Sequence, residues 1–367
     1  MRRQKHVSMK LRHSLTIFCY FLVISPSYSQ IPTGYYNSAK TSTGEALKDS
    51  LNNIISGHIE FPYTSSSQMD CWDVLKQADK DPYNANNVIG LYSRFSMDGP
   101  LEYNSAQGWS REHVWAKSRG DFGTDKGAGT DLHNLFAEDV STNSARNNRN
   151  FDTGDTRYLD KSGTYMGPTD AYTSSTDWIW EPPDALKGDV ARVIFYMDVR
   201  YAGENGELDL QVIDSLMDKS DQSPLHCNGK TLYSWHLLDS VSTEERMRND
   251  TIYKYQQNRN PFVDHPEFLQ SIYEATFGEL PVGMEEVMKK DTYTIYPNPS
   301  ADYLIIESNY DAIKKVLITN DGGKVILERN YHSKTVQLRT TTLAKGLYYI
   351  QLTTSAGELS TRVHLIE

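Results

Sequence analysis

Hydrophobic residues recur at helical spacing in five stretches of the chain, and each stretch predicts a helix. Capping residues and prolines indicate where several of these helices begin or end. The predicted helices lie over 45–59, with Leu47, Leu51, Ile54, Ile55 and His58 on one face; around Trp72 and Leu75, ending before Asp81-Pro82; over 184–200, with Val190, Ile194 and Met197; from a Ser242/Glu245 capping box towards Tyr255; and from Pro266 through Phe268, Leu269 and Ile272.

The pattern changes from helical spacing to alternation after about residue 285. The sequence Asn320-Asp321-Gly322-Gly323 between two alternating segments is a strong hairpin signal. From Tyr293 onwards we expect a compact antiparallel sandwich, separate from the upstream domain. Its predicted strands are Tyr303–Glu307, Lys315–Thr319, Lys324–Leu327, Thr335–Leu338, Leu347–Leu352 and Thr361–Leu365.

Residues 81–180 have few long apolar runs and are rich in Asn, Gly, Asp and Ser. This composition predicts a loop-rich segment, and loops held by a rigid scaffold are where functional sites tend to lie. Helices upstream, short strands in the middle and a β-rich end predict an α+β fold.

The first residues have the pattern of a secretory signal peptide. Five basic residues precede the apolar stretch from Leu15 to Ile24, and small residues at Ser27 and Ser29 follow it. The alternative is a membrane anchor, but about ten apolar residues are too few to span a bilayer core. We therefore expect a signal peptide over residues 1–29, and a mature protein that is exported through the periplasm with no stable membrane span.

Composition is that of a soluble globular protein, with 38% hydrophobic and 23% charged residues in 367. The net charge of −11 becomes −16 without the leader, because 32 basic residues then face 48 acidic ones. Such a charge argues against tight binding of nucleic acid through its phosphates. A nucleic-acid partner would therefore require a local basic cleft and a bound metal ion.

Two cysteines, Cys71 and Cys227, remain once Cys19 is removed with the leader. They form one candidate disulfide in an oxidising compartment, although spacing alone does not show that they are close enough to pair. Neither has the spacing of a zinc site.

The residue types needed for phosphodiester hydrolysis gather between 109 and 151. His113 is the side chain best suited to act as a base near neutral pH. The Glu112 carboxylate and the Asn143 amide offer the oxygen ligands that Mg²⁺ prefers. Neighbours in a strand point to opposite faces, so Glu112 and His113 can share a site only where the strand ends or bulges. With Ser141 or Thr142 as a helix N-cap, Asn143 would lie in the first helical turn.

Three ordered motifs in this segment resemble the bacterial endonuclease I family of His-Me finger (ββα-metal) nucleases. They are Arg-Glu-His-Val-Trp at 111–115, Asp-Leu-His-Asn-Leu at 131–135 and Asn-Ser-Ala-Arg-Asn-Asn at 143–148, and the block from Asn258 to Glu267 is also similar to family members. The resemblance covers roughly residues 45–275. Two departures, Ala116 and Ala137 where the family usually has proline, concern loop stiffness more than chemistry.

The resemblance implies a role for each matching position. It assigns His113 as the general base and Glu112 and Asn143 as ligands of one divalent cation, normally Mg²⁺, with Ca²⁺ or Mn²⁺ as alternatives. It implies cleavage of DNA, and often RNA, with little sequence preference and with 5′-phosphate products. We expect phosphate contacts from an arginine, with Arg119, Arg146 and Arg149 as candidates, and we place His133 and Asn134 behind the ligands or in structural positions.

Two other functions compete with a nuclease. The first is a surface-attached binding or adhesive protein built on an inactive nuclease scaffold, and the intact Glu112, His113 and Asn143 argue against it. The second is another class of hydrolase. The chain has neither a Gly-x-Ser-x-Gly elbow nor a His-Glu-x-x-His zinc helix, which argues against the common serine hydrolases and zinc proteases.

The end of the chain has a resemblance of its own. Tyr296-Pro-Asn-Pro-Ser300, Lys345–Leu352 and Arg362–Leu365 resemble the C-terminal sorting domain of the type IX secretion system. The resemblance implies recognition by that machinery and then secretion or attachment to the cell surface; the alternative is a carbohydrate-binding or adhesive sandwich. We therefore predict a signal peptide at 1–29, a catalytic domain at 30–285 and a sorting domain at 293–367.

Overall fold

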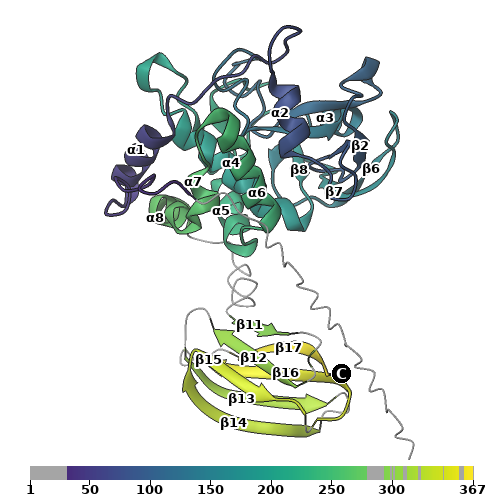
Figure 1. The fold of residues 1–367 in the computed structure, drawn as a ribbon, viewed down its shortest axis with the longest axis vertical. Helices are drawn as coiled ribbons and strands as arrows, with labels where there is room; N and C mark the ends of the chain where they lie inside the picture. The colour runs from purple at the N-terminus through teal and green to yellow at the C-terminus, as the bar shows by residue number, and fades with distance from the viewer. Residues whose placement is uncertain are drawn as a thin grey trace, which may run out of the picture.

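The structure is a computed structural model that describes residues 31–278, 293–297, 300, 302–308, 312–320, 324–341, 343–354 and 359–366. Within these residues it is a mixed α/β protein with eight α-helices and a β-rich C-terminal region (Figure 1). The predicted signal peptide lies outside the described residues. Among the described helices, none has the length and apolar character needed to cross a bilayer.

Helix α4 (Lys187–Arg200) lies at the centre of the helical region, and nearly all of its side chains are buried. The helices α1 (Gly44–Ile55), α5 (Gly229–Leu238) and α7 (Pro261–Asp264) pack against it. Helix α8 (Pro266–Phe277) covers α1 and α5, while α6 (Thr243–Gln256) packs on α2 (Cys71–Ala78). The apolar spacing of α1, α4 and α8 therefore corresponds to the faces that meet in this core, while Trp72 and Leu75 of α2 belong to a second apolar cluster.

The predicted helices form, with two differences at their ends. Helix α1 stops at Ile55 rather than at residue 59, because Ser56 is extended and Gly57 has a φ of +67°. At the start of α6, Ser242 Oγ accepts the backbone N–H of Glu245 at 3.0 Å. The Glu245 carboxylate, however, binds Arg192 rather than the Ser242 backbone, so only half of the predicted capping box forms.

An antiparallel hairpin followed at once by a helix forms the middle of the molecule. Strands β3 (Trp109–His113) and β4 (Leu135–Asp139) pair with Trp109 opposite Asp139 and His113 opposite Leu135. Helix α3 (Val140–Arg146) begins directly after β4 and contacts both strands. The predicted N-cap was wrong: the Asp139 carboxylate caps the helix by accepting from the N–H groups of Ser141 and Thr142.

Short strands and 3₁₀ turns complete this part of the chain. Strands β5, β8, β7 and β6 form one sheet in that order, β1 pairs with β2, and β9 pairs with β10. Their bounds are β1 Asn87–Ile89, β2 Ser96–Asp98, β5 Asn150–Phe151, β6 Thr156–Asp160, β7 Gly167–Thr173, β8 Ile179–Glu181, β9 Gln211–Val212 and β10 Leu225–His226, with 3₁₀ turns at Asn104–Ala106, Asp184–Leu186 and Glu204–Gly206.

The C-terminal region has two antiparallel sheets with an apolar core of their own. Their alternating pattern buries every second side chain, as in Tyr303–Ser308 and Thr335–Arg339. The predicted hairpin turn at 321–323 lies outside the described residues, and the domain boundaries remain a prediction. The strands are β11 Tyr293–Tyr296, β12 Tyr303–Ser308 and β15 Thr335–Arg339 in one sheet, and β14 Val325–Ser333, β13 Ile313–Asn320, β16 Gly346–Thr354 and β17 Leu359–Ile366 in the other.

The candidate disulfide does not form, because Cys71 and Cys227 are both buried and both free. Cys71 begins α2, and its Sγ lies 3.7 Å from the carbonyl oxygen of Thr130. Cys227 follows β10, and its Sγ lies 3.9 Å from His226 Nδ1. Each thiol packs among different neighbours, and burial raises the pKa of both to about 12, so they behave as small apolar side chains.

Candidate active site

A cavity of about 540 Å³ opens where β3 ends beside α3. Strand β3 and helix α3 supply two parts of its wall, and the remainder comes from Trp72 of α2, from the loops near residues 63, 103 and 117, and from the residues just after α3. The residues that line it are Tyr63, Trp72, Tyr103, Ser110, Arg111, Glu112, His113, Ala116, Lys117, Ser118, Val140, Asn143, Ser144, Asn147 and Asn148.

Glu112, His113 and Asn143 all line this cavity. The two neighbours Glu112 and His113 reach the same space because His113 is the last residue of β3, where strand geometry ends. Asn143 lies in the middle of α3, not in its first turn as predicted, and its Nδ2 donates to Ser110 Oγ at 2.9 Å. This bond joins α3 to β3 and sets the orientation of the amide.

Glu112 is buried, with 2% of its surface exposed, and keeps two polar contacts through Oε1. The Tyr92 hydroxyl donates to Oε1 at 2.9 Å, and Arg146 Nε lies 3.3 Å from the same atom. Burial raises the pKa of Glu112 to about 7, against the lowering effects of Arg146 and Tyr92. The cost of burying the carboxylate therefore outweighs the stabilisation that Arg146 and Tyr92 give to its charged form.

His113 is held by its Nε2, which lies 3.0 Å from the carbonyl oxygen of Gly129. A carbonyl only accepts, so Nε2 carries the proton and donates, and Nδ1 keeps its lone pair. Tyr63 stacks on the imidazole with ring centroids 5.8 Å apart. Burial lowers the pKa of His113 to about 3, so the ring is neutral near pH 7 and can accept a proton.

The three arginines proposed as phosphate contacts do not line the cavity, which corrects that expectation. Arg119 is buried and donates to the carbonyl oxygens of Asp218, Asp221 and Asn148. Arg146 is fully buried and donates to the carbonyls of His113, Val114 and Asn147. Arg149 stacks on Trp178 at 3.8 Å and donates to the Ala145 carbonyl. Backbone carbonyls accept from both terminal nitrogens of Arg119 and of Arg146, and sequence spacing does not reveal such contacts.

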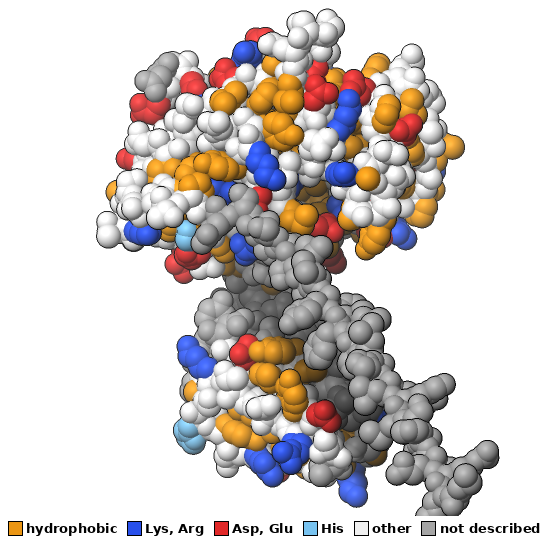
Figure 2. Space-filling view, in the orientation of Figure 1, with side chains coloured by type: hydrophobic (Ala, Val, Ile, Leu, Met, Phe, Trp, Pro, Cys, Tyr) orange, Lys and Arg blue, Asp and Glu red, His pale blue; other side chains and the backbone are white. Residues whose placement is uncertain are grey.

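The cations that do line the cavity are Arg111 and Lys117. The Arg111 guanidinium lies between the rings of Tyr63 and Trp72, 3.4 Å and 4.0 Å from their centroids. Lys117 is exposed. Sequence reasoning missed Arg111, although alternation along β3 places it on the same side as His113. On the face shown in Figure 2, basic side chains are scattered among acidic ones and form no continuous basic surface.

His133 and Asn134 do not line this cavity, and His133 lines a smaller one near Glu245 and Arg248. The Asn134 side chain binds the Trp115 backbone twice: Oδ1 accepts from N at 2.7 Å, and Nδ2 donates to O at 3.2 Å. It therefore holds the segment that leaves β3 after His113. His133 Nε2 lies 3.2 Å from the Asn258 carbonyl oxygen. This contact joins the segment just before β4 to the segment just after α6.

Residues 43–267 match the Endonuclease I family. The chain belongs to this family. It is similar to two proteins named "Extracellular ribonuclease". The one from Bacillus subtilis (strain 168) is 47% identical over 240 residues, which is 65% of this chain and 78% of that protein. The one from Bacillus amyloliquefaciens is 44% identical over 254 residues, or 68% and 81%.

Residues 294–366 match the Secretion system C-terminal sorting domain, which confirms the type IX prediction. The endonuclease I chain is therefore a nuclease, a hydrolase of nucleic acid, that is secreted or held at the cell surface.

The family depends on a divalent metal, and the donor set at the cavity fits one. A carboxylate has about four acceptor positions, and the Glu112 contacts on Oε1 leave acceptor capacity for a cation. Asn143 donates through Nδ2, so its amide oxygen stays available. Among the described residues no group of three or more His, Cys, Asp and Glu could hold a metal. One carboxylate and one amide suit an ion that completes its coordination with water and phosphate oxygens.

Proposed function

We propose that the protein is a metal-dependent endonuclease of the His-Me finger fold that hydrolyses phosphodiester bonds in RNA and DNA with little sequence preference. The observation that carries the proposal is the β3–β4–α3 unit, which brings Glu112, His113 and Asn143 to one cavity. The extracellular ribonucleases among its relatives support RNA as a substrate. The family resemblance supports DNA and 5′-phosphate products.

His113 acts as the general base in this proposal. Its Nε2–H bond to the Gly129 carbonyl fixes the ring, so Nδ1 is the atom that takes the proton from the attacking water. Tyr63 on one face of the ring restricts its rotation. The imidazole takes up this proton, and the negatively charged phosphate nearby stabilises the resulting imidazolium.

Glu112 and Asn143 would hold the divalent cation, for which Mg²⁺ is our first choice and Ca²⁺ or Mn²⁺ are alternatives. When bound, the ion neutralises charge that develops on the phosphate and on the leaving oxygen. Arg146 keeps the Glu112 carboxylate in place from behind, and the Ser110 hydroxyl orients the Asn143 amide. Arg111 and Lys117 add positive charge on the cavity wall, where the substrate backbone would pass.

The test is cleavage of plasmid DNA and of a single-stranded RNA by the mature protein, with Mg²⁺, Mn²⁺ or Ca²⁺ and with chelator. We expect cleavage only with metal, and His113→Ala should lower kcat by about 10²–10⁴-fold. His332→Ala, an exposed histidine on β14, is the matched control and should cleave normally. Products should accept a 5′ label from a kinase only after phosphatase treatment.

Two results would overturn the proposal. Intact substrates with every ion would favour the alternative of a binding protein on an inactive scaffold. Equal cleavage by His113→Ala would remove His113 as the base.

A further inference from the structure

Tyr103 is an exposed aromatic side chain on the wall of the active-site cavity, with 55% of its surface accessible. The other two aromatic residues of the wall, Tyr63 and Trp72, are each covered by the Arg111 guanidinium. Within the described part of the chain, no ring or cation stacks on Tyr103. A flat apolar ring is therefore presented, uncovered, to whatever enters the cavity.

The loop that carries Tyr103 has a strained backbone. Tyr103, Asn104, Ser105 and Ala106 have φ values of 44°, 42°, 55° and 66°, a left-handed run that is costly for residues with a Cβ. Such conformations persist where the surrounding structure holds them, and they gather at binding and active sites. The loop therefore warrants a functional explanation for the side chain it presents.

Backbone bonds hold this loop directly against the start of β3. The N–H of Tyr103 donates to the Trp109 carbonyl at 2.7 Å, and Gly108 donates to the Tyr103 carbonyl at 3.1 Å. A Cβ on Gly108 would lie 1.8 Å from the Leu101 carbonyl oxygen, so this close approach requires glycine. Tyr103 is thus fixed relative to the strand that ends in Glu112 and His113.

The charge balance shows what such a ring could contribute. The chain carries a net charge of −11, and the cavity wall offers only Arg111 and Lys117 as cations beside His113. Attraction for phosphates alone is then weak and is lost further as salt rises. Stacking of a base on an aromatic side chain adds affinity that does not depend on net charge, and it accepts every base because each has a π face.

We propose that Tyr103 forms a nucleobase subsite of the active-site cavity, which takes an unpaired base next to the scissile phosphate and so favours single-stranded RNA or DNA over duplex. This inference rests on the proposed function, because it assumes a nucleic-acid substrate in this cavity. In a duplex both faces of each base are covered by its neighbours, so a base must be unstacked before it can contact the ring. A volume of about 540 Å³ lies within the range of small-molecule sites.

The experiment measures binding in chelator, so that it does not depend on cleavage. Fluorescence anisotropy gives the Kd of the mature protein for a labelled single strand, for the same strand with abasic positions, and for the duplex. We expect the wild type to bind the base-bearing single strand best. Tyr103→Ala should weaken that binding about tenfold and bring it to within twofold of the abasic strand.

Matched variants separate stacking from folding. Tyr103→Phe keeps the ring and should retain the preference for bases, whereas Tyr103→Leu keeps apolar bulk without a π face and should lose it. Tyr83→Ala removes a tyrosine that is 96% exposed and outside the cavity wall, and it should bind like the wild type. Equal thermal unfolding midpoints will show that the variants are folded.

The inference is overturned if folded Tyr103→Ala, or Tyr103→Leu, still prefers the base-bearing strand as the wild type does. It is also overturned if the wild type binds abasic and base-bearing strands equally. Neither result would touch the proposed function, which fails instead when no divalent ion supports cleavage.

Discussion

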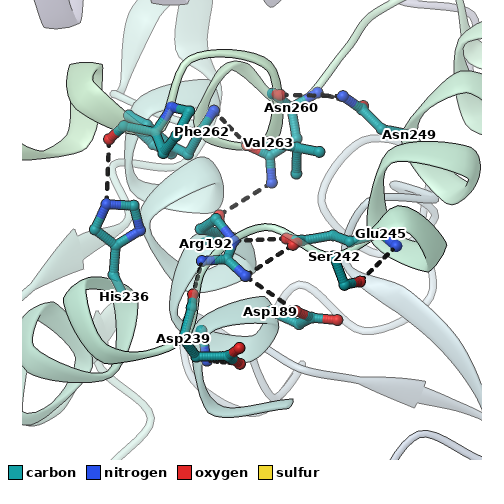
Figure 3. A network of polar contacts seen from close by, with 12 residues as sticks. Asp189, Arg192, His236, Asp239, Ser242, Glu245, Asn249, Asn260, Phe262 and Val263 are labelled. Atoms are coloured by element: carbon teal, nitrogen blue, oxygen red, sulfur yellow. Dashed lines mark hydrogen bonds and ion pairs between the residues drawn. The ribbon is translucent and has the colours of Figure 1, made fainter. Parts of the chain in front are cut away.

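Two buried arginine–glutamate pairs in the described part of the chain differ in how completely their polar atoms form hydrogen bonds. In the first, Arg192 of α4 meets Glu245 of α6 through two bonds, Nε to Oε1 at 2.6 Å and Nη2 to Oε2 at 2.7 Å (Figure 3). Asp189 and the Asp239 carbonyl take further donors of the same guanidinium. Only a cavity of about 30 Å³ lies beside Asp189 and Glu245.

In the second pair, Arg146 approaches Glu112 through a single contact of 3.3 Å. Nε makes this contact without the geometry of a hydrogen bond and is buried with no hydrogen-bond partner among the described residues, while Nη1 and Nη2 donate to backbone carbonyls. The Glu112 carboxylate faces a cavity of about 540 Å³. The comparison teaches that a buried charge pair does not by itself indicate a functional site. A buried carboxylate that keeps free acceptor positions beside an open cavity does indicate one.

The largest expected effect compares the same substitution in both pairs. Glu245→Gln leaves the Arg192 charge buried without its bidentate partner and should lower the free energy of unfolding by about 3–5 kcal/mol. Glu112→Gln should change it by less than about 1 kcal/mol, because burial already raises the pKa of Glu112 to about 7 and glutamine resembles the neutral acid. Urea unfolding in chelator measures both. Equal losses would mean that the two pairs are equivalent.

The second prediction sharpens the comparison through His236, which lies beside Arg192 in the network of the first pair (Figure 3). Burial, assisted by Arg192, lowers the pKa of His236 to about 3. The unfolded histidine titrates near 6.5, so its stabilising contribution is present above that pH and is lost as pH falls towards 3. The stability difference between wild type and His236→Gln should therefore shift by about 2 kcal/mol against the wild type between pH 7 and pH 5.

Urea unfolding at the two pH values checks this prediction. A difference that stays constant with pH would show that His236 takes up its proton over the same pH range in the folded and unfolded protein, and that the network around Arg192 is more open than the structure indicates.

The smallest effects compare cations at the cavity with cations away from it. Lys117→Gln should lower kcat/KM on RNA by about twofold to fivefold, since an exposed charge contributes little in water. Arg149→Gln should change it by less than twofold, because Arg149 stacks on Trp178 outside the cavity wall. Steady-state kinetics at low salt measures both values of kcat/KM. A larger loss of kcat/KM with Arg149→Gln would indicate that Arg149 does contact the substrate phosphates.

Sequence pattern predicted the features that depend on local spacing. The apolar faces of α2, α4 and α8 follow directly from the spacing of their hydrophobic residues. A shared site for Glu112 and His113 required the strand to end or bulge there, and β3 does end at His113. Features set by distant partners could not be predicted. The Arg119 guanidinium donates to carbonyl oxygens about a hundred residues away. The Glu245 carboxylate accepts from Arg192, 53 residues away, instead of capping its own helix. The Asp139 cap was missed because serine and threonine at 141 and 142 are equally good caps.

The central claim is that Glu112 and Asn143 hold the catalytic cation beside His113. Anomalous diffraction at the manganese edge tests it most directly, on crystals of His113→Ala protein grown with Mn²⁺ and a short single-stranded oligonucleotide. We predict a manganese peak in contact with the Glu112 carboxylate and the Asn143 amide oxygen, with a phosphate oxygen of the oligonucleotide among its ligands. A peak away from both residues, or none at a Mn²⁺ concentration that supports cleavage by the wild type, would contradict the account.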